Sequence, residues 1–188
     1  MNPADIRIET TRLLMRPPIR ADFDAWAAIA TDAENMRHLG GVQQRPAAWR
    51  HFAFAVGSWH LQGFGAFSLI EKATGRWVGR CGPLYPEGWP GTEVGYTLAR
   101  EFWGRGFALE AATAAIDWAF ANLDWSEVIH CISADNLASI AVATKLGSRK
   151  LRTARMPAPY EGVEVDIWGQ TRAEWQSRIK DRDAFAND

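Results

Sequence analysis

The stretch Thr97-Leu-Ala-Arg-Glu-Phe-Trp-Gly-Arg-Gly-Phe-Ala-Leu-Glu110 decides how this chain is interpreted. A predicted strand ends here, a loop with two closely spaced glycines follows, and a predicted helix begins at Phe107. Backbone N–H groups at a helix start have no partner inside the helix, and the helix dipole adds partial positive charge. Gly104 and Gly106 permit positive φ and leave no Cβ in the way of an anion. The stretch therefore predicts a turn that holds a phosphate or diphosphate, with Arg105 as an added positive contact.

Other phosphate-binding motifs fit this stretch less well. A Rossmann fingerprint requires a third glycine or alanine where this chain has Leu109, and a P-loop requires Gly-Lys followed by Ser or Thr. A glycine turn that merely links a strand to a helix remains the alternative, because glycine is the default residue of such turns.

The segments beside the turn predict mixed α/β structure. The helix Phe107–Ala121 is apolar on most of its faces, and its many alanines would allow a close approach to a sheet. Before it, Gly65–Glu71, Trp77–Leu84 and Thr92–Ala99 have the pattern of an antiparallel meander. After it, Val128–Ser133 is a strand, so strand, helix and strand form a parallel crossover.

The outer segments complete what we expect to be one domain over residues 1–188. A strand is predicted over Glu9–Arg16, and a helix over Asp22–Asp32 buries one apolar stripe. Asn136–Leu146 predicts a short helix with Asn136 as its N-cap and Gly147 as its stop. Further elements are expected as a helix from Pro46 that buries Trp49, Phe52, Ala53 and Val56, a strand over Gly162–Gln170 and a helix over Ala173–Lys180.

Composition excludes several function classes. The chain has 21 basic and 22 acidic side chains with no basic surplus, so a nucleic-acid partner is not expected. Cys81 and Cys131 lie far apart, and no Cys/His spacing resembles a metal site, so neither a disulfide framework nor a metal is expected. No apolar run approaches the ~20 residues that span a bilayer, and Met1–Thr11 is unlike a secretory signal. We therefore expect a cytoplasmic protein without a membrane partner.

The glycine turn resembles the signature of the GNAT N-acetyltransferase superfamily, Gln/Arg-x-x-Gly-x-Gly/Ala, which aligns with Trp103–Ala108. Trp103 departs from the usual first residue, and this departure is typical of the RimJ/RimL-like branch, the ribosomal-protein alanine N-acetyltransferase type. Four further segments resemble that branch in the same order along the chain, over roughly residues 8 to 175: Ile8–Pro17, Glu93–Tyr96, Asn136–Ser139 and Lys145–Gly147.

The resemblance implies the acyl-CoA N-acyltransferase fold. In this fold a mixed, mostly antiparallel sheet of about six to seven strands is splayed between strands 4 and 5 and flanked by helices. It also implies that the turn residues hold the CoA diphosphate: Trp103, Gly104, Arg105, Gly106, Phe107 and Ala108. The strand before the turn, at Tyr96, Thr97 and Leu98, would bind the pantetheine arm.

The implied reaction transfers an acetyl group from acetyl-CoA, as co-substrate, to a primary amine by direct attack in a ternary complex. The acceptor is either a protein N-terminus or a small-molecule amine. A non-catalytic acyl-CoA-binding module with the same fold is the alternative. The sequence leaves open whether the protein is a monomer or a homodimer.

Glu93 is the predicted base, because a half-buried strand carboxylate can have a raised pKa. The alternatives are an exposed strand residue or an electrostatic anchor for the incoming ammonium. By the resemblance, Ser139 lies near the CoA sulfur and protonates the leaving thiolate, although it could be an ordinary first-turn serine. Asn136 bonds the pantetheine arm in the same comparison, besides capping its helix. Tyr160 is a reserve proton donor, and otherwise a packing or acceptor-site residue.

Aromatic residues suggest where the acceptor binds. Most of the ten tryptophans are expected in the core, and Trp89 and Trp168 are the best candidates for the wall of an acceptor pocket. His130 lies on a strand that would border the gap and could face the acceptor, and a core or surface histidine is the favoured interpretation.

Overall fold

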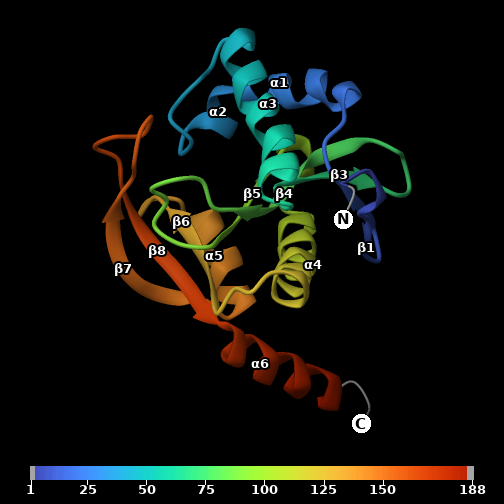
Figure 1. Cartoon of the computed structure of the whole chain (residues 1–188), viewed down its shortest axis with the longest axis vertical. Helices are drawn as coiled ribbons and strands as arrows, with labels where there is room; N and C mark the ends of the chain where they lie inside the picture. Colours follow the sequence, from blue (N-terminus) through green and yellow to red (C-terminus); the bar gives the residue numbers. More distant parts are fainter. Residues whose placement is uncertain (1–2, 186–188) are drawn as a thin grey trace.

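The computed structural model describes residues 3–185, in which a twisted sheet lies between two groups of helices (Figure 1). The sheet has eight strands in the order β1-β2-β3-β4-β5-β6-β8-β7. Their bounds are β1 Ile8–Glu9, β2 Leu13–Arg16, β3 Phe67–Glu71, β4 Trp77–Leu84, β5 Glu93–Leu98, β6 Glu127–Ile132, β7 Arg149–Arg155 and β8 Glu164–Thr171.

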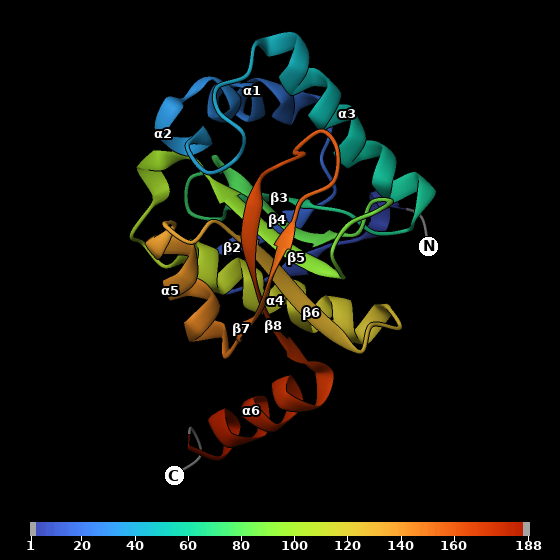
Figure 2. The same ribbon diagram turned by 90° about the vertical axis from the view of Figure 1, so that its left-hand side faces the viewer.

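Helices α1–α3 lie on one side of the central strands and α4 on the other (Figure 1). Helix α6 extends away from the body in both views (Figures 1 and 2). The helices are α1 Phe23–Thr31, α2 Ala33–Met36, α3 Arg45–Leu61, α4 Phe107–Asn122, α5 Leu137–Leu146 and α6 Arg172–Phe185. None of those within residues 3–185 is both long and apolar enough to cross a membrane.

Helix α4 is the centre of the largest core cluster. Ala111, Ala112, Ala115 and Ala119 are completely buried, as the alanine pattern predicted. Because alanine adds so little bulk, the helix lies close against β4 and β5. This packing fixes the first turn of α4 directly behind the end of β5.

The sheet is antiparallel except between β5 and β6, which run parallel on either side of α4. These two strands are paired only at Glu93 and Ile129. Beyond this pair the strands separate. This is the splay expected between strands 4 and 5, which are β5 and β6 here because the predicted first strand is two strands, β1 and β2. The predicted fold is confirmed.

Several local predictions differ from the structure. The predicted strand Glu9–Arg16 is a hairpin of β1 and β2, because the Thr10 hydroxyl accepts a hydrogen bond from the Leu13 N–H and closes a turn between them. In α3, Trp49 and Ala53 are exposed, whereas Ala48 and Ala55 are buried with Phe52. Trp59 is buried in the main core cluster. Strand β7 was missed and raises the count to eight, since its almost wholly polar, exposed residues show no alternation.

Candidate active site

The glycine turn (residues 103–108) has the open geometry that its sequence predicted. Gly104 and Gly106 have φ values of +70° and +79°, and α4 begins at Phe107. The first internal bond of the helix runs from the Glu110 N–H to the Gly106 carbonyl, at 3.1 Å. Within residues 3–185 no hydrogen bond uses the N–H groups of residues 104–109. Six consecutive donors are therefore open at the positive end of a buried helix.

The side chains of the turn are engaged inside the protein. The Trp103 N–H donates to the Arg100 carbonyl at 3.0 Å, and its indole donates to the Leu98 carbonyl at 2.8 Å. Arg105 pairs with the Glu71 carboxylate at 2.8 Å, so its guanidinium is engaged by the protein and does not face the open side of the turn. Phe107 is buried, and Ala108 is half-buried. The turn therefore presents main-chain groups rather than charged side chains.

A polar brace from the β1–β2 hairpin holds the turn in place. Glu110, in the first turn of α4, accepts hydrogen bonds from the Thr10 hydroxyl at 2.6 Å and from Arg12 Nε at 2.6 Å. Arg12 also donates to the Arg105 carbonyl at 2.8 Å and lies over the Phe107 ring. Burial acts to raise the pKa of Glu110, but the bonds from Thr10 and Arg12 outweigh it and lower the pKa.

The edge of β5 that faces β6 is open near the turn. Carbonyls alternate along a strand, and those of Thr92 and Val94 face β6, where they accept from the Ile129 N–H and the His130 ring. The main-chain groups of Tyr96 and the carbonyl of Leu98 lie on the same edge. Leu98 is already occupied, since its carbonyl accepts from Asn35 and Trp103. Thr97 instead faces β4 with its main chain, so Tyr96 is the open residue of the three.

Glu93 lies where the two strands separate. It is only 7% exposed, and its carboxylate accepts from the Trp89 indole at 2.6 Å and from the Cys131 N–H at 3.1 Å. Burial raises the pKa of Glu93, while both hydrogen bonds act to lower it. Nothing but this carboxylate lies within 4 Å of a Cβ built on Gly95, so space is open beside it.

Two side chains replace the next hydrogen bond of the β5–β6 ladder. In a continuing parallel pair the Cys131 N–H would donate to the Val94 carbonyl. Here the Cys131 N–H donates to Glu93, and the Val94 carbonyl accepts from His130 Nδ1 at 2.7 Å. Both main-chain groups are satisfied without strand pairing. Glu93 and His130 therefore account physically for the splay.

His130 is a core histidine, as the sequence favoured. It is 2% exposed, and burial lowers its pKa to about 4, so the ring is neutral at pH 7. Since Nδ1 donates to a carbonyl, Nε2 carries no hydrogen. Trp168 is directly opposite His130 on β8 and shares its face of the sheet, away from Glu93. Trp168 is therefore not part of an acceptor wall with Glu93, and that prediction was wrong.

The start of α5 closes the other side of the gap. Asn136 caps the helix, because its side-chain oxygen accepts from the Ser139 N–H at 3.1 Å. The Tyr96 hydroxyl donates to the Ser139 carbonyl at 3.0 Å and ties β5 to α5. Within residues 3–185 the Ser139 hydroxyl makes no hydrogen bond. Its proton is thus available to a bound molecule.

Trp89 and Tyr160 line the face on which Glu93 lies. The Trp89 indole bonds Glu93, and its ring meets Tyr160 edge to face, with centroids 6.4 Å apart. A Cβ built on Gly40 would be 3.4 Å from the Tyr160 ring, so the β7–β8 loop meets the α2–α3 loop. Figure 2 shows the β7–β8 loop reaching toward α1–α3. The sequence predicted Trp89 for an aromatic wall and offered Tyr160 as a packing or acceptor-site residue. The contact between their rings is found only in the structure.

Sequence reasoning did not identify the hairpin brace. Thr10, Arg12 and Glu110 come together from positions about a hundred residues apart, as the pairing of Arg12 with Glu110 shows. No local spacing marks such a contact. The only available signal was the acidic residue in the first turn of α4, which suits the helix dipole.

Comparisons with known proteins agree with this geometry. The domain described as Acetyltransferase (GNAT) domain matches residues 12–149. The uncharacterized N-acetyltransferase p20 of Bacillus licheniformis is 32% identical over 162 residues, covering 85% of this chain and 91% of that protein. The uncharacterized protein YkkB of Bacillus subtilis (strain 168) is 38% identical over 98 residues, covering 50% of this chain and 57% of YkkB.

A solved structure extends the likeness to the fold. The acetyltransferase from Agrobacterium tumefaciens str. C58 superimposes with a TM-score of 0.79 at 29% identity, covering 89% of this chain and 95% of that one. The family domain matched at residues 12–149 includes β5, the glycine turn, α4 and β6. The chain belongs to the GNAT acetyltransferase family, whose members transfer an acetyl group from acetyl-CoA to an amine.

Proposed function

We propose that this protein is an N-acetyltransferase that binds the acetyl-CoA diphosphate with the N–H groups of residues 104–109 and receives a primary amine beside Glu93. The observation that carries the proposal is the row of open donors at the start of α4. A diphosphate satisfies such donors without any charged side chain. The open edge of β5 at Tyr96 then guides the pantetheine arm toward the gap, as an added strand would.

Glu93 accepts the proton of the attacking amine, directly or through one water. Its burial supports this role, because a desolvated carboxylate with a raised pKa is a stronger base than an exposed one. The open space beside Gly95 gives an amine access to the carboxylate. As the C–N bond forms and the C–S bond breaks, one proton passes to Glu93 and another is needed by the departing thiolate.

Ser139 relays the second proton: its hydroxyl gives a proton to the thiolate while it takes one up from solvent. The hydroxyl is suited to this because it is at the start of α5 beside the gap and has no internal partner within residues 3–185. Asn136 fixes the position of Ser139 and faces the pantetheine arm with its remaining amide. Tyr160, from the β7–β8 loop, is the alternative donor.

Direct attack by the amine is favoured over an acetylated cysteine. Burial raises the pKa of the Cys81 thiol. Burial and the neighbouring Glu93 carboxylate raise that of Cys131. The thiolate is the nucleophilic form, so neither cysteine is suited to form an acyl-enzyme.

We place the chain in the RimJ/RimL-like branch because of Trp103 and the four ordered segments that resemble it. In this chain the Trp103 indole donates to the Leu98 carbonyl, which joins the strand before the turn to the turn itself. This contact gives a structural reason for tryptophan at the position. Peptide N-termini are accordingly the first acceptors to test.

The test is acetyl-CoA-dependent thiol release across a panel of N-terminal peptides and small amines, with CoA binding measured by calorimetry. We expect tight CoA binding and at least one amine that raises thiol release far above the rate without amine. If CoA binds and no amine is acetylated, the protein is a non-catalytic acyl-CoA-binding module. If ADP or NAD binds as tightly as CoA, the turn serves another nucleotide.

A further inference from the structure

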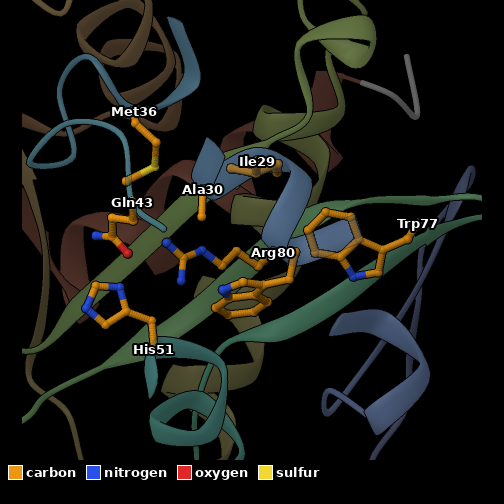
Figure 3. A pocket seen from close by; sticks show the side chains of 8 residues that line it. Ile29, Ala30, Met36, Gln43, His51, Trp77 and Arg80 are labelled. Atoms are coloured by element: carbon orange, nitrogen blue, oxygen red, sulfur yellow. The ribbon is translucent and has the colours of Figure 1, made fainter. Parts of the chain in front are cut away.

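A second pocket lies under α1–α3, on the face of the sheet that carries Glu93. Arg80 of β4 projects into it, and its guanidinium lies over the Trp26 ring at 4.3 Å. Figure 3 shows the guanidinium reaching between Gln43 and His51. Stacking on a tryptophan holds the planar fork in one orientation. The guanidinium is thus positioned rather than free in solvent.

This cation has no acidic partner in the part of the chain that the structure describes. Within residues 3–185 other arginines, such as Arg12, Arg16 and Arg105, form ion pairs, whereas Arg80 forms neither an ion pair nor a hydrogen bond. Burial lowers its pKa to about 10, so it stays charged at pH 7. The half-buried guanidinium has five N–H donors that no described protein group uses, and an anion would accept several of them at once.

The neighbours of Arg80 that line the pocket add no negative charge to it. Burial lowers the pKa of His51, and the charges of Arg80 and Arg50 lower it further. The Gln43 side-chain oxygen is buried without a hydrogen-bond partner. A half-turn of this amide would present its NH₂ group to an anion instead. The pocket therefore combines one fixed cation with an adjustable amide and contains no acid among its described lining residues.

The pocket is in line with Glu93. Arg80 is paired with Thr97 and Leu84 with Glu93, so Arg80 and Glu93 share one face of the sheet, four residues apart along β5. At a rise of ~3.3 Å per residue, this separates the two positions by about 13 Å. Gly95 leaves the floor between them without a side chain. Tyr160 bridges the same interval, since it contacts Trp89 and is close enough to influence the pKa of Arg80.

We infer that the Arg80 pocket binds a carboxylate of the acceptor, so that the substrate is an amine with a carboxylate on the order of 10 Å from the reacting nitrogen. The cavity has space for about one water-sized group, 10 Å³, which admits one oxygen of a carboxylate. A free α-amino acid is too short to reach both sites. A short peptide with an acidic residue after its N-terminus, or a long ω-amino acid, has the required span. This inference rests on the proposed function.

Matched acceptor pairs test it. Each pair differs only in one group: peptides with Asp or Asn at the third or fourth position, and 6-aminohexanoate with 6-aminohexanamide. We expect the wild type to prefer the carboxylate member of the best pair at least tenfold in kcat/KM, mainly through KM. Arg80→Met should remove the preference, Arg80→Lys should keep part of it, and the exposed neighbour Arg50→Met should keep all of it. Equal rates for both members in the wild type would overturn the inference.

A binding experiment separates this inference from the proposed enzyme activity. The side-chain Nε–H resonance of Arg80 is identified by its loss in Arg80→Met, and propionate or propionamide is titrated into the ¹⁵N-labelled protein. Propionate is expected to shift this resonance at millimolar concentration, and propionamide is not. If no amine is acetylated but propionate shifts the resonance, the carboxylate site stands and the enzyme proposal fails. If neither propionate nor propionamide shifts the Arg80 resonance, the carboxylate site is overturned.

Discussion

The two halves of the site, at opposite ends of β5, are built from different parts of the polypeptide. At the Leu98 end, the glycine turn and the first turn of α4 offer main-chain N–H groups, and their side chains are engaged elsewhere. At the Glu93 end, the chemistry depends on the Glu93 carboxylate and on the side chains of Trp89 and Tyr160 from two loops. The half at the Leu98 end, which we call the CoA half, therefore depends on backbone shape. The half at the Glu93 end, the acceptor half, depends on the identity of each residue.

The comparison predicts its largest effect at Glu93. Glu93→Gln removes the proton acceptor, so kcat should fall by about 10² to 10⁴, the usual contribution of a general base. CoA affinity, measured by calorimetry, should change less than about threefold, because the turn is at the other end of β5. The matched control is Glu127→Gln, an exposed glutamate on β6. Wild-type turnover of Glu93→Gln across the pH range would remove Glu93 from the chemistry.

The second effect concerns stability at acid pH, through His130. Its pKa falls from 6.5 unfolded to about 4 folded, so the unfolded chain takes up the proton first as the pH falls. The protein should lose about 3 kcal/mol from this group between pH 7 and pH 4, and only about 0.4 kcal/mol more at lower pH.

His130→Asn is the variant that isolates this loss, because its amide can still donate to the Val94 carbonyl. Urea unfolding at pH 7 and pH 4 should show a smaller loss in His130→Asn than in the wild type. The exposed residue His60, replaced in the same way, should leave the loss unchanged. An identical acid response in His130→Asn would contradict the buried neutral ring.

The third effect tests the CoA half with substitutions at two glycines. Gly106→Ala forces alanine to φ +79° at a cost of about 1–2 kcal/mol and brings a Cβ to 3.4 Å from the Arg12 guanidinium. We expect CoA affinity to fall about tenfold, with kcat retained at saturating CoA. Gly63→Ala has a similar φ, +76°, in the loop between α3 and β3, where nothing lies within 4 Å of the added Cβ. This control variant should lose a similar free energy of unfolding and keep its CoA affinity. If its CoA affinity also falls, the loss in Gly106→Ala reflects reduced stability alone.

The smallest effect is expected at the brace. Glu110→Gln keeps the shape and removes the charge that pairs with Arg12, so CoA affinity should fall about two- to fivefold, the scale of one partly exposed ion pair. The loss should shrink at high salt, because such pairs are screened. A large loss of kcat at saturating CoA would place Glu110 in the acceptor half instead, and so break the comparison.

The sequence predicted the CoA half well, because its residues are close together along the chain. Strand, two glycines and alanine-rich helix follow one another within Thr97–Glu110, and their geometry follows from φ preferences and helix-end donors. The N-cap role of Asn136 and the stop at Gly147 were equally local, and both are confirmed.

The acceptor half could be predicted only in part, because it depends on tertiary contacts. Glu93 was identified by resemblance, while its bonds to Trp89 and Cys131 depend on how the loop and β6 pack. Period-two alternation could not assign Trp168 to a face, since that depends on its register opposite His130. Arg80 had no local signal at all, because the absence of an acidic partner is a property of the folded pocket.

The most direct test of the central claim is to follow the backbone amide resonances of residues 104–109 during titration of the ¹⁵N-labelled protein. Titration with CoA and with pantetheine, which lacks the diphosphate, separates the contribution of that group. The account predicts that CoA shifts these six resonances strongly and that pantetheine leaves them nearly unchanged while it perturbs Tyr96. Saturating CoA binding with all six resonances unmoved would contradict it.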